Sequence, residues 1–376
     1  MPDPKRILIF VADLGFGHRS AANAIKTALN NQHGDACSVE IVNPMDSPHT
    51  PSFFRSSQQE YDHWVRELPD LYQINYEISD TPMVSSLYES AYVLMLLRAI
   101  LDTLSRFEPD VIVVVQQTFL APLDAAFTLL GKRVPVVTVI TDLTTIHRMW
   151  FHPVSTYCVV PTDDARVQAL DAGLSKAQVK QVGIPVNPAF MREHRSKADI
   201  RAENGWAQDV TTVLAVGSKR TRQLTDMLRI LNHSGLPLQL VVVAGGDEEL
   251  HQELERTDWH LPTRIYAYAD NVPALMRAAD VIMCKAGGLI VSEALAAGLP
   301  ILLFDVIEGQ ETGNADYVVE QGAGVLAHEP IILLETMFHW LQHDQADLRR
   351  TAAQSQRAGR PNAANEIAKL IWKAME

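Results

Sequence analysis

A glycine-rich segment near the start of the chain places a histidine and an arginine at the beginning of an expected helix. The segment follows the apolar run 7–12 and contains Gly15, Gly17, His18 and Arg19. Glycines allow a ligand to approach the backbone, and a helix N-terminus attracts negative charge. A histidine at this place can act as a general base. A tight turn with a helix-capping histidine explains the same pattern, so both interpretations stay open here.

A second polar segment follows the apolar run 134–140. It begins with Thr141 and Asp142 and continues through His147 to Trp150. At the end of a strand, Asp142 is placed to orient or support catalytic groups, although simple capping of the strand end is an alternative. Asp142, His147 and His152 are metal-ligating residue types. Their spacing on an extended loop matches no zinc pattern, so we expect a metal-free role.

A third segment joins a glycine pair to the start of a helix. An apolar strand at 281–284 is followed by Lys285, then by Gly287 and Gly288, and Glu293 lies in the first turns of the next helix. Free N–H groups and the positive helix end form a phosphate cradle. A carboxylate at Glu293 can accept two hydrogen bonds from a ribose diol. A favourable interaction with the helix dipole explains Glu293 as well, but it does not explain the glycine pair.

A fourth segment follows the apolar run 301–304 and gathers amide and carboxylate side chains. Gln310, Glu311 and Asn314 fall within five positions of one another. Sugar hydroxyls need both donors and acceptors, which these side chains supply. A cluster that caps the N-terminus of a helix is the alternative.

These segments belong to two similar series of elements. Buried-strand patterns alternate with helical stretches in the first half at residues 7–12, 39–42, 111–115, 134–140 and 157–160, and in the second half at residues 211–216, 238–243, 264–266, 281–284 and 301–304. Apolar side chains on both faces indicate parallel sheets wrapped by helices, an α/β fold. Two prolines and a glycine at 183–188 suit a stiff connection between two domains. An amphipathic helix is expected at 363–375.

Residues 43–80 interrupt the alternation. The stretch is rich in turn formers and in aromatic residues, namely Phe53, Phe54, Tyr61, Trp64, Tyr72 and Tyr76. We expect an insertion of loops and short helices. Core packing accounts for most of these aromatics, and an acceptor-binding or membrane-facing surface is the functional alternative.

Composition narrows the class of protein. The net charge is −13 over 376 residues, which argues against nucleic-acid binding and against non-specific adhesion to an anionic membrane. The three cysteines, Cys37, Cys158 and Cys284, form no CxxC pair, so neither a zinc site nor a disulfide framework is expected, and a reducing compartment fits. We find no signal-peptide pattern. No apolar run reaches the ~18–20 residues of a membrane-spanning helix. The longest, 91–100, is interrupted by Arg98.

Taken in order along the chain, the four segments resemble the monogalactosyldiacylglycerol synthases and the bacterial diacylglycerol glucosyltransferases, which are related to the peptidoglycan lipid-intermediate N-acetylglucosaminyltransferase. Residues 279–324 resemble that family most strongly, especially at 309–314 and 317–319. The glycine–histidine–arginine element, residues 139–152 and the hinge at 183–186 are similar as well. The matches are collinear over nearly the whole chain.

The resemblance implies a GT-B fold, an α/β arrangement of two Rossmann-like domains facing across a cleft. We expect an acceptor domain at 1–186, a donor domain at 187–358 and a C-terminal helix at 359–376, which in one arrangement crosses back to the first domain. The implied reaction is the inverting, metal-independent transfer of a hexose from a UDP-sugar to diacylglycerol, giving a β-linked glycolipid. No cofactor and no nucleic acid are implied, and the expected location is cytoplasmic, peripheral on the inner face of the cell membrane.

Site residues follow from the resemblance by position. His18 is the implied catalytic base, and Asp142 supports it. The implied acceptor-binding residues are Gly15, Phe16, Gly17, His147 and Trp150. The implied donor-binding residues are Gly217, Lys219, Arg220, Tyr268, Gly287, Gly288, Glu293, Gln310, Glu311 and Asn314. Within this set Glu293 would hold the ribose, and residues near Tyr268 would border the uracil.

Two departures from the family pattern keep alternatives open. The family has a run of glycines where this chain has Gly217, Ser218, Lys219 and Arg220, and it tends to have a histidine where Gln116 and Gln117 stand. Lys219 and Arg220 can neutralise a diphosphate by charge. The alternatives are a GT-B enzyme with another lipid or small acceptor, a UDP-sugar epimerase, and a non-catalytic nucleotide-sugar-binding protein. Galactose and glucose both remain open as the hexose; Gly313 before Asn314 leans toward the galactosyl branch.

Overall fold

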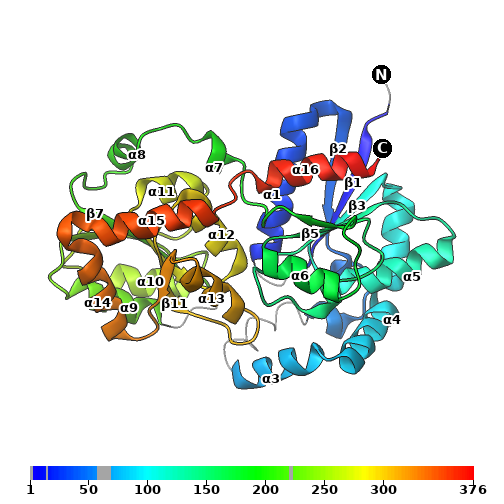
Figure 1. The fold of residues 1–376 in the computed structure, drawn as a ribbon, viewed down its shortest axis with the longest axis horizontal. Coiled ribbons are helices and arrows are strands. Elements are labelled where there is room, and N and C mark those ends of the chain that lie inside the picture. Colours follow the sequence, from blue (N-terminus) through cyan, green and yellow to red (C-terminus); the bar gives the residue numbers. More distant parts are fainter. Residues whose placement is uncertain (1–2, 14–15, 57–68, 220–222) are drawn as a thin grey trace. The chain divides into compact units, whose positions relative to one another are not determined.

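The computed structural model describes residues 3–13, 16–56, 69–219 and 223–376. It divides into two compact units (Figure 1). The first contains Met1–Pro188, Glu308–Gln310 and Asn362–Glu376, and the second contains Ala189–Ile307 and Glu311–Pro361. Each unit is built around a six-stranded parallel sheet.

The first sheet has the strand order β2-β1-β3-β4-β5-β6. Its strands are β1 (Lys5–Phe10), β2 (Cys37–Val42), β3 (Val111–Val114), β4 (Val136–Val139), β5 (Tyr157–Val160) and β6 (Val179–Gln181). β3 and β4 are buried along their whole length, because helices cover both faces of the sheet. Chain order reverses between β1 and β3. In open parallel sheets, ligands bind beyond the carboxyl ends of the strands at such a switch point.

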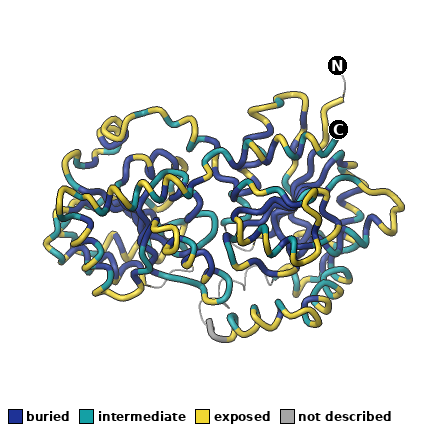
Figure 2. Tube along the Cα trace, in the orientation of Figure 1, coloured by how far each residue is buried: buried dark blue, intermediate teal, exposed yellow. Residues whose placement is uncertain are grey.

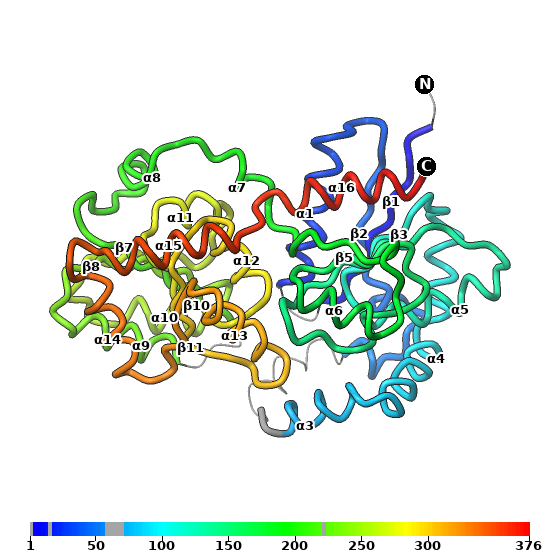
Figure 3. The backbone as a smooth tube through the Cα atoms, viewed as in Figure 1, coloured from blue at the N-terminus to red at the C-terminus, as the bar shows by residue number. Residues whose placement is uncertain are grey.

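Helices close both faces of this sheet. They are α1 (Phe16–His33), α3 (Pro69–Ser79), α4 (Pro82–Phe107), α5 (Leu120–Leu130), α6 (Asp163–Asp171) and α16 (Ala363–Ala374). Ile25 of α1 and Ile367 of α16 lie in the hydrophobic cluster on one face. Leu96 and Ile100 of α4 lie in the cluster that contains Leu123 of α5. Figure 3 shows α16, in red, running beside α1, and the His33 and Trp372 rings stack at 3.7 Å between centroids.

The second sheet repeats the design with the strand order β12-β11-β10-β7-β8-β9. Its strands are β7 (Thr211–Val216), β8 (Leu238–Val243), β9 (Thr263–Tyr266), β10 (Val281–Lys285), β11 (Ile301–Asp305) and β12 (Gly324–Leu326). Its helices are α7 (Ala189–Arg192), α8 (Lys197–Glu203), α9 (Leu224–Asn232), α10 (Glu248–Arg256), α11 (Val272–Ala278), α12 (Gly288–Ala297), α13 (Thr312–Glu320), α14 (Pro330–Leu341) and α15 (Ala346–Ala358). Here chain order reverses between β7 and β10, so the loops after these two strands meet at the switch point.

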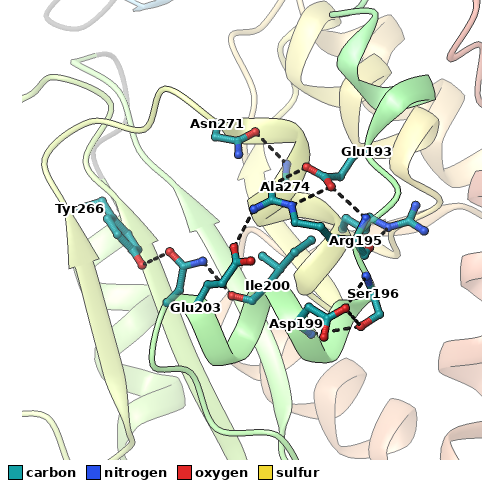
Figure 4. Close-up of polar contacts among 11 residues, drawn as sticks. Glu193, Arg195, Ser196, Asp199, Ile200, Glu203, Tyr266, Asn271 and Ala274 are labelled. Carbon is teal, nitrogen blue, oxygen red and sulfur yellow. Dashed lines mark hydrogen bonds and ion pairs between the residues drawn. The ribbon is translucent and has the colours of Figure 1, made fainter.

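Charged side chains fix the segment that enters the second unit (Figure 4). The Arg195 guanidinium donates to Glu193 at 2.5 Å and to Glu203 at 2.6 Å. Ser196 and Asp199 form a capping box at the start of α8. These local bonds satisfy backbone groups at the helix end, so the segment needs little apolar burial to hold its conformation.

The structure corrects one expectation from the sequence. Helix α4 is long and apolar enough to cross a membrane, judged by its length and composition alone. In the structure, 22% of its most apolar 18-residue window is buried. The uninterrupted apolar run is short because Arg98 and polar residues divide it. A helix collects apolar residues from several turns on one face, so runs underestimate its apolar surface. The sequence patterns also did not predict the short strands β6 and β12.

Candidate functional site

A pocket in the first unit lies at the carboxyl ends of β1, β3 and β4. Its volume is about 390 Å³, within the usual range for ligand sites. The lining residues are His18, Met45, Phe54, Leu71, Tyr72, Asn75, Tyr76, Ser79, Tyr88, Tyr92, Gln116, Gln117, Thr118, Asp142, His147, Met149 and Gln310. The pocket therefore has polar groups from the strand ends and an aromatic wall from α3 and α4.

His18 is oriented by a neighbouring strand. Thr141, which follows β4, lies with Oγ1 3.1 Å from Nδ1 of His18. The Trp150 ring packs at 6.5 Å from the imidazole and is itself almost completely buried. The ring of His18 is thus held by groups that lie more than a hundred positions away in the chain.

Asp13, which follows β1, is tied to the start of α1. Arg19 donates to both carboxylate oxygens of Asp13, at 2.7 and 2.8 Å, and Asn43 donates to Asp13 at 3.2 Å. Such a two-pronged pair fixes geometry as well as charge. Gly15, expected to bind acceptor, lies outside the described residues, and so does the side chain of Phe16. Gly17 lies in the first turn of α1.

His147 is a buried member of the pocket wall. Its Nε2 lies 3.2 Å from the Ser79 hydroxyl, and its Nδ1 accepts a hydrogen bond from the Met149 amide at 3.3 Å. Burial lowers the pKa of His147, an effect that the nearby Asp80 carboxylate partly opposes. His147 therefore ties the end of α3 to the loop after β4. Of the expected catalytic and acceptor residues, His18, Asp142 and His147 line this one pocket, and Trp150 lies behind it.

Several residues that line this pocket had no specific role in the sequence interpretation. Tyrosines of α3 and α4 form its wall; the aromatic richness of 43–80 pointed to Tyr72 and Tyr76 of α3, and nothing in the sequence interpretation pointed to Tyr88 and Tyr92 of α4. The side-chain oxygens of Gln116 and Gln117 are buried and have no hydrogen-bond partner among the described residues. An unpaired buried acceptor is costly, so both oxygens are suited to donors supplied by a ligand. Gln310 also lines the pocket, and its Oε1 accepts a hydrogen bond from the Tyr72 hydroxyl at 2.7 Å.

A second cluster of expected site residues lies at the switch point of the second unit. Gly287 is the N-cap of α12 and Gly288 its first residue, so backbone N–H groups point out of the helix start beyond β10. Lys285, the last residue of β10, forms an ion pair with the buried Glu311 carboxylate. The other carboxylate oxygen of Glu311 accepts from the Ile307 amide at 3.2 Å. Lys285 is a cation that the sequence interpretation left without a role, although its place directly after a strand was a usable signal.

Asn314 and Glu293 are two further donor candidates of the second unit, and Asn314 supports this loop. Asn314 is buried, and its amide donates to the carbonyl oxygen of Ala286 at 3.0 Å, which holds the chain just before the glycine pair. Glu293 lies on α12, and burial raises the pKa of its carboxyl group to about 8. Their contacts with a nucleotide sugar stay predictions.

The remaining donor candidates lie in other loops of the second unit. Gly217 follows β7, where a Cβ atom would approach Leu250 to 2.5 Å, so only glycine fits without a shift. Lys219 and Tyr268 are exposed. Arg220 lies outside the described residues. Within the described ranges no group of three or more histidine, cysteine or acidic side chains is placed to hold a metal ion.

Comparison with known proteins decides the family. Residues 18–186 match the model of monogalactosyldiacylglycerol (MGDG) synthase, and residues 211–371 match that of the glycosyltransferase family 28 C-terminal domain. The chain is 32% identical to the chloroplastic monogalactosyldiacylglycerol synthase of Spinacia oleracea, over 97% of this chain and 71% of that protein. It is 31% identical to monogalactosyldiacylglycerol synthase 1 of Arabidopsis thaliana, over 97% and 70%.

The chain belongs to the monogalactosyldiacylglycerol synthase family. It is a glycosyltransferase, as the sequence resemblance predicted.

Solved structures confirm the GT-B fold of this monogalactosyldiacylglycerol synthase homologue. MurG of Acinetobacter baumannii aligns with a TM-score of 0.63 at 16% identity, over 98% of this chain and all of that one. The UDP-GlcNAc 2-epimerase of Neisseria meningitidis, solved with UDP-GlcNAc, aligns with a TM-score of 0.65 at 15% identity, over the same shares. At such identities the likeness shows the fold alone. The fold is therefore shared with epimerases, and family membership separates this chain from them.

Proposed function

We propose that this protein transfers a hexose, galactose or glucose, from a UDP-sugar to the free hydroxyl of diacylglycerol with inversion, giving a β-glycosyl glycerolipid. The observation that carries the proposal is the orientation of His18 by Thr141 inside a pocket. The chain that forms this pocket is similar over 97% of its length to a monogalactosyldiacylglycerol synthase. The proposal goes beyond family membership, because it assigns substrates and residues.

On the acceptor side, the proposed step is a single displacement. The lipid hydroxyl oxygen forms a bond to the anomeric carbon while the bond from that carbon to the diphosphate oxygen breaks. The hydroxyl proton moves to Nε2 of His18, and the electron pair leaves with UDP. For Nε2 to accept this proton, Nδ1 carries the ring hydrogen and donates it to Oγ1 of Thr141, which lies 3.1 Å away. The Gln116 and Gln117 oxygens receive hydrogen bonds from the glycerol headgroup or from water bound to it.

On the donor side, the leaving diphosphate gains negative charge. The helix start at Gly287 and Gly288 offers N–H groups to it, and Lys285 adds a positive charge next to them. We assign no metal and no cofactor to the reaction. Glu293, Glu311 and Tyr268 complete the proposed donor set as ribose, hexose and uracil neighbours.

We also place the protein at a membrane surface, peripherally on the inner face of the cell membrane. A diacylglycerol acceptor resides in a bilayer, so the enzyme must reach it there. The net charge of −13 makes electrostatic adhesion to anionic lipid unfavourable. Apolar contacts must then supply the attraction.

The reaction is tested with purified protein, diacylglycerol micelles and either UDP-galactose or UDP-glucose, without added metal. We expect a β-glycolipid with one of the two donors, and we expect His18→Ala to lower kcat by about 10²–10⁴-fold while UDP binding persists. His49→Ala, at a histidine outside the pocket lining, is the matched control and should retain activity. UDP binding without product from either donor would overturn the diacylglycerol assignment.

A further inference from the structure

Two tyrosines of α3 hold the short segment 308–310. This segment lies between β11 and α13, but it belongs to the first compact unit. The Tyr72 hydroxyl donates a partly buried hydrogen bond to Oε1 of Gln310 at 2.7 Å. The Tyr76 ring lies against Gly309, where an added Cβ atom would approach it to 3.3 Å. Along α3 exposed positions alternate with half-buried ones (Figure 2), and both tyrosines are half-buried.

The residues on either side of this segment are bonded to each other. The Glu311 amide donates to the carbonyl oxygen of Ile307 at 2.8 Å, and the Ile307 amide donates to the Glu311 carboxylate at 3.2 Å. The same carboxylate pairs with Lys285, the cation that we assign to the diphosphate. Gln310 therefore directly precedes a residue that is fixed in the proposed donor site, while its own side chain is held by α3.

The bond from Tyr72 restricts a side chain that is otherwise flexible. A free glutamine samples several rotamers, and a ligand that orders it loses affinity because this freedom disappears on binding. A glutamine that is already held has less freedom to lose. Because Oε1 of Gln310 accepts from the phenol, we expect a sugar hydroxyl that contacts this amide to accept from its N–H groups.

We propose that Tyr72 is a positioning residue for the donor sugar, and that its hydrogen bond holds Gln310 in the orientation that binds the hexose. The inference rests on the proposed function for the contact between Gln310 and the hexose. It adds to donor recognition a residue of α3 that was so far only part of the pocket wall. UDP has no hexose, so the loss of the Tyr72 hydroxyl should weaken the binding of UDP-hexoses and not of UDP.

The test is calorimetric titration of the full chain with UDP, UDP-galactose and UDP-glucose in the absence of lipid. Tyr72→Phe keeps the ring and removes the hydroxyl. We expect it to raise the Kd of the more tightly bound UDP-hexose by about three- to tenfold, and to leave the Kd of UDP within about twofold of the parent. Tyr157→Phe is the matched control, since Tyr157 begins β5, at the strand end opposite to the pocket, and it should change neither value.

A double-mutant cycle separates positioning from a general structural role. Gln310→Ala removes the amide that Tyr72 holds, and it should weaken UDP-hexose binding by itself. Tyr72→Phe should then cause no further loss in the Gln310→Ala background, because the two changes remove the same interaction. A tyrosine that only stabilised α3 would weaken binding to the same extent in both backgrounds.

Three results would overturn the positioning role. They are equal weakening of UDP and UDP-hexose binding by Tyr72→Phe, unchanged UDP-hexose binding by this variant, and additive losses in the cycle. The titrations contain no acceptor, so they are independent of the reaction. A hexose-specific loss in a protein that forms no glycolipid from diacylglycerol would leave the role of Tyr72 standing and overturn the reaction. Glycolipid formation by Tyr72→Phe with an unchanged kcat/KM for the donor would do the reverse.

Discussion

His18 and Glu311 owe their chemistry to partners that other strands supply. The imidazole of His18 is held by Thr141 after β4, and the Glu311 carboxylate pairs with Lys285 at the end of β10. Removing one partner of a buried ion pair typically costs about 3–5 kcal/mol, so Lys285 is structural as well as a candidate phosphate ligand. Each proposed role thus depends on a contact between residues that are far apart in sequence.

Glu293 should make UDP binding depend on pH. Its pKa of about 8 means that the free protein holds it protonated at neutral pH. A carboxylate that accepts two hydrogen bonds from ribose must be ionised, so UDP affinity should rise with pH toward about 8, by up to about tenfold per unit, and then level off. Calorimetric titration from about pH 6 to pH 9 measures this. Glu293→Gln should give a flat profile; a flat profile in the parent protein would contradict the ribose assignment.

The raised pKa of Glu293 also makes the free energy of unfolding depend on pH. This free energy falls as the pH rises, whereas UDP affinity rises. Between the ordinary carboxyl pKa and about 8, the folded chain keeps the Glu293 proton that the unfolded chain has released. The free protein therefore loses stability as the pH rises through this window. Glu293→Gln should remove that contribution, which denaturant titrations at several pH values can detect.

At the scale of elements, both units place their candidate site residues on the same strand–loop–helix arrangement. A buried parallel strand is followed by a loop and then by a helix whose first N–H groups have no partner within the helix. In the first unit this arrangement precedes α1, where Arg19 of the helix bonds to Asp13 after β1. In the second it precedes α12, with Asn314 fixing the loop. Because the carboxyl ends of parallel strands share one edge, loops from several strands converge there.

The loop before α12 gives a prediction for Gly287→Ala. Gly287 has φ −67°, which alanine adopts freely, and an added Cβ would lie 3.5 Å from both Lys285 Nζ and Glu311 Oε1. Stability should therefore stay within about 0.5 kcal/mol of the parent, as for most substitutions free of strain. The methyl group occupies space that we assign to the diphosphate, so UDP affinity should fall about tenfold. Chemical denaturation and UDP titration check the two parts, and unchanged affinity would remove the diphosphate from this loop.

At the scale of the whole molecule, the C-terminal helix completes the first unit. The side chains of Ile367 and Ile371 are fully buried in the core cluster that includes residues of β1, β3 and α1. The first unit therefore cannot close its sheet with residues 1–188 alone. A chain that leaves a unit and returns to it makes the stability of that unit depend on both ends of the sequence.

Ile367→Ala should consequently destabilise the first unit and spare the second. Truncating a buried isoleucine typically costs about 2–5 kcal/mol. Native-state hydrogen exchange should show reduced protection in β1 and β3, with β7 and β10 unchanged. Lys369→Ala, at an exposed position of the same helix, should alter neither. Equal loss of protection in both sheets would mean that the two units unfold together.

The amino-acid sequence by itself determined the α/β class, most strands of both sheets and the segments that hold the candidate site. Buried strands and glycine turns are local patterns, so residues 157–160 and 211–216 were predicted as the structure has them. Only the tertiary structure placed Thr141 beside His18 and paired Lys285 with Glu311, because these contacts depend on the order of the strands in each sheet. It also showed that the Gln116 and Gln117 side-chain oxygens have no hydrogen-bond partner among the described residues. The apolar surface of α4 also required the helix, since its residues are distant in sequence and adjacent only once the chain is coiled.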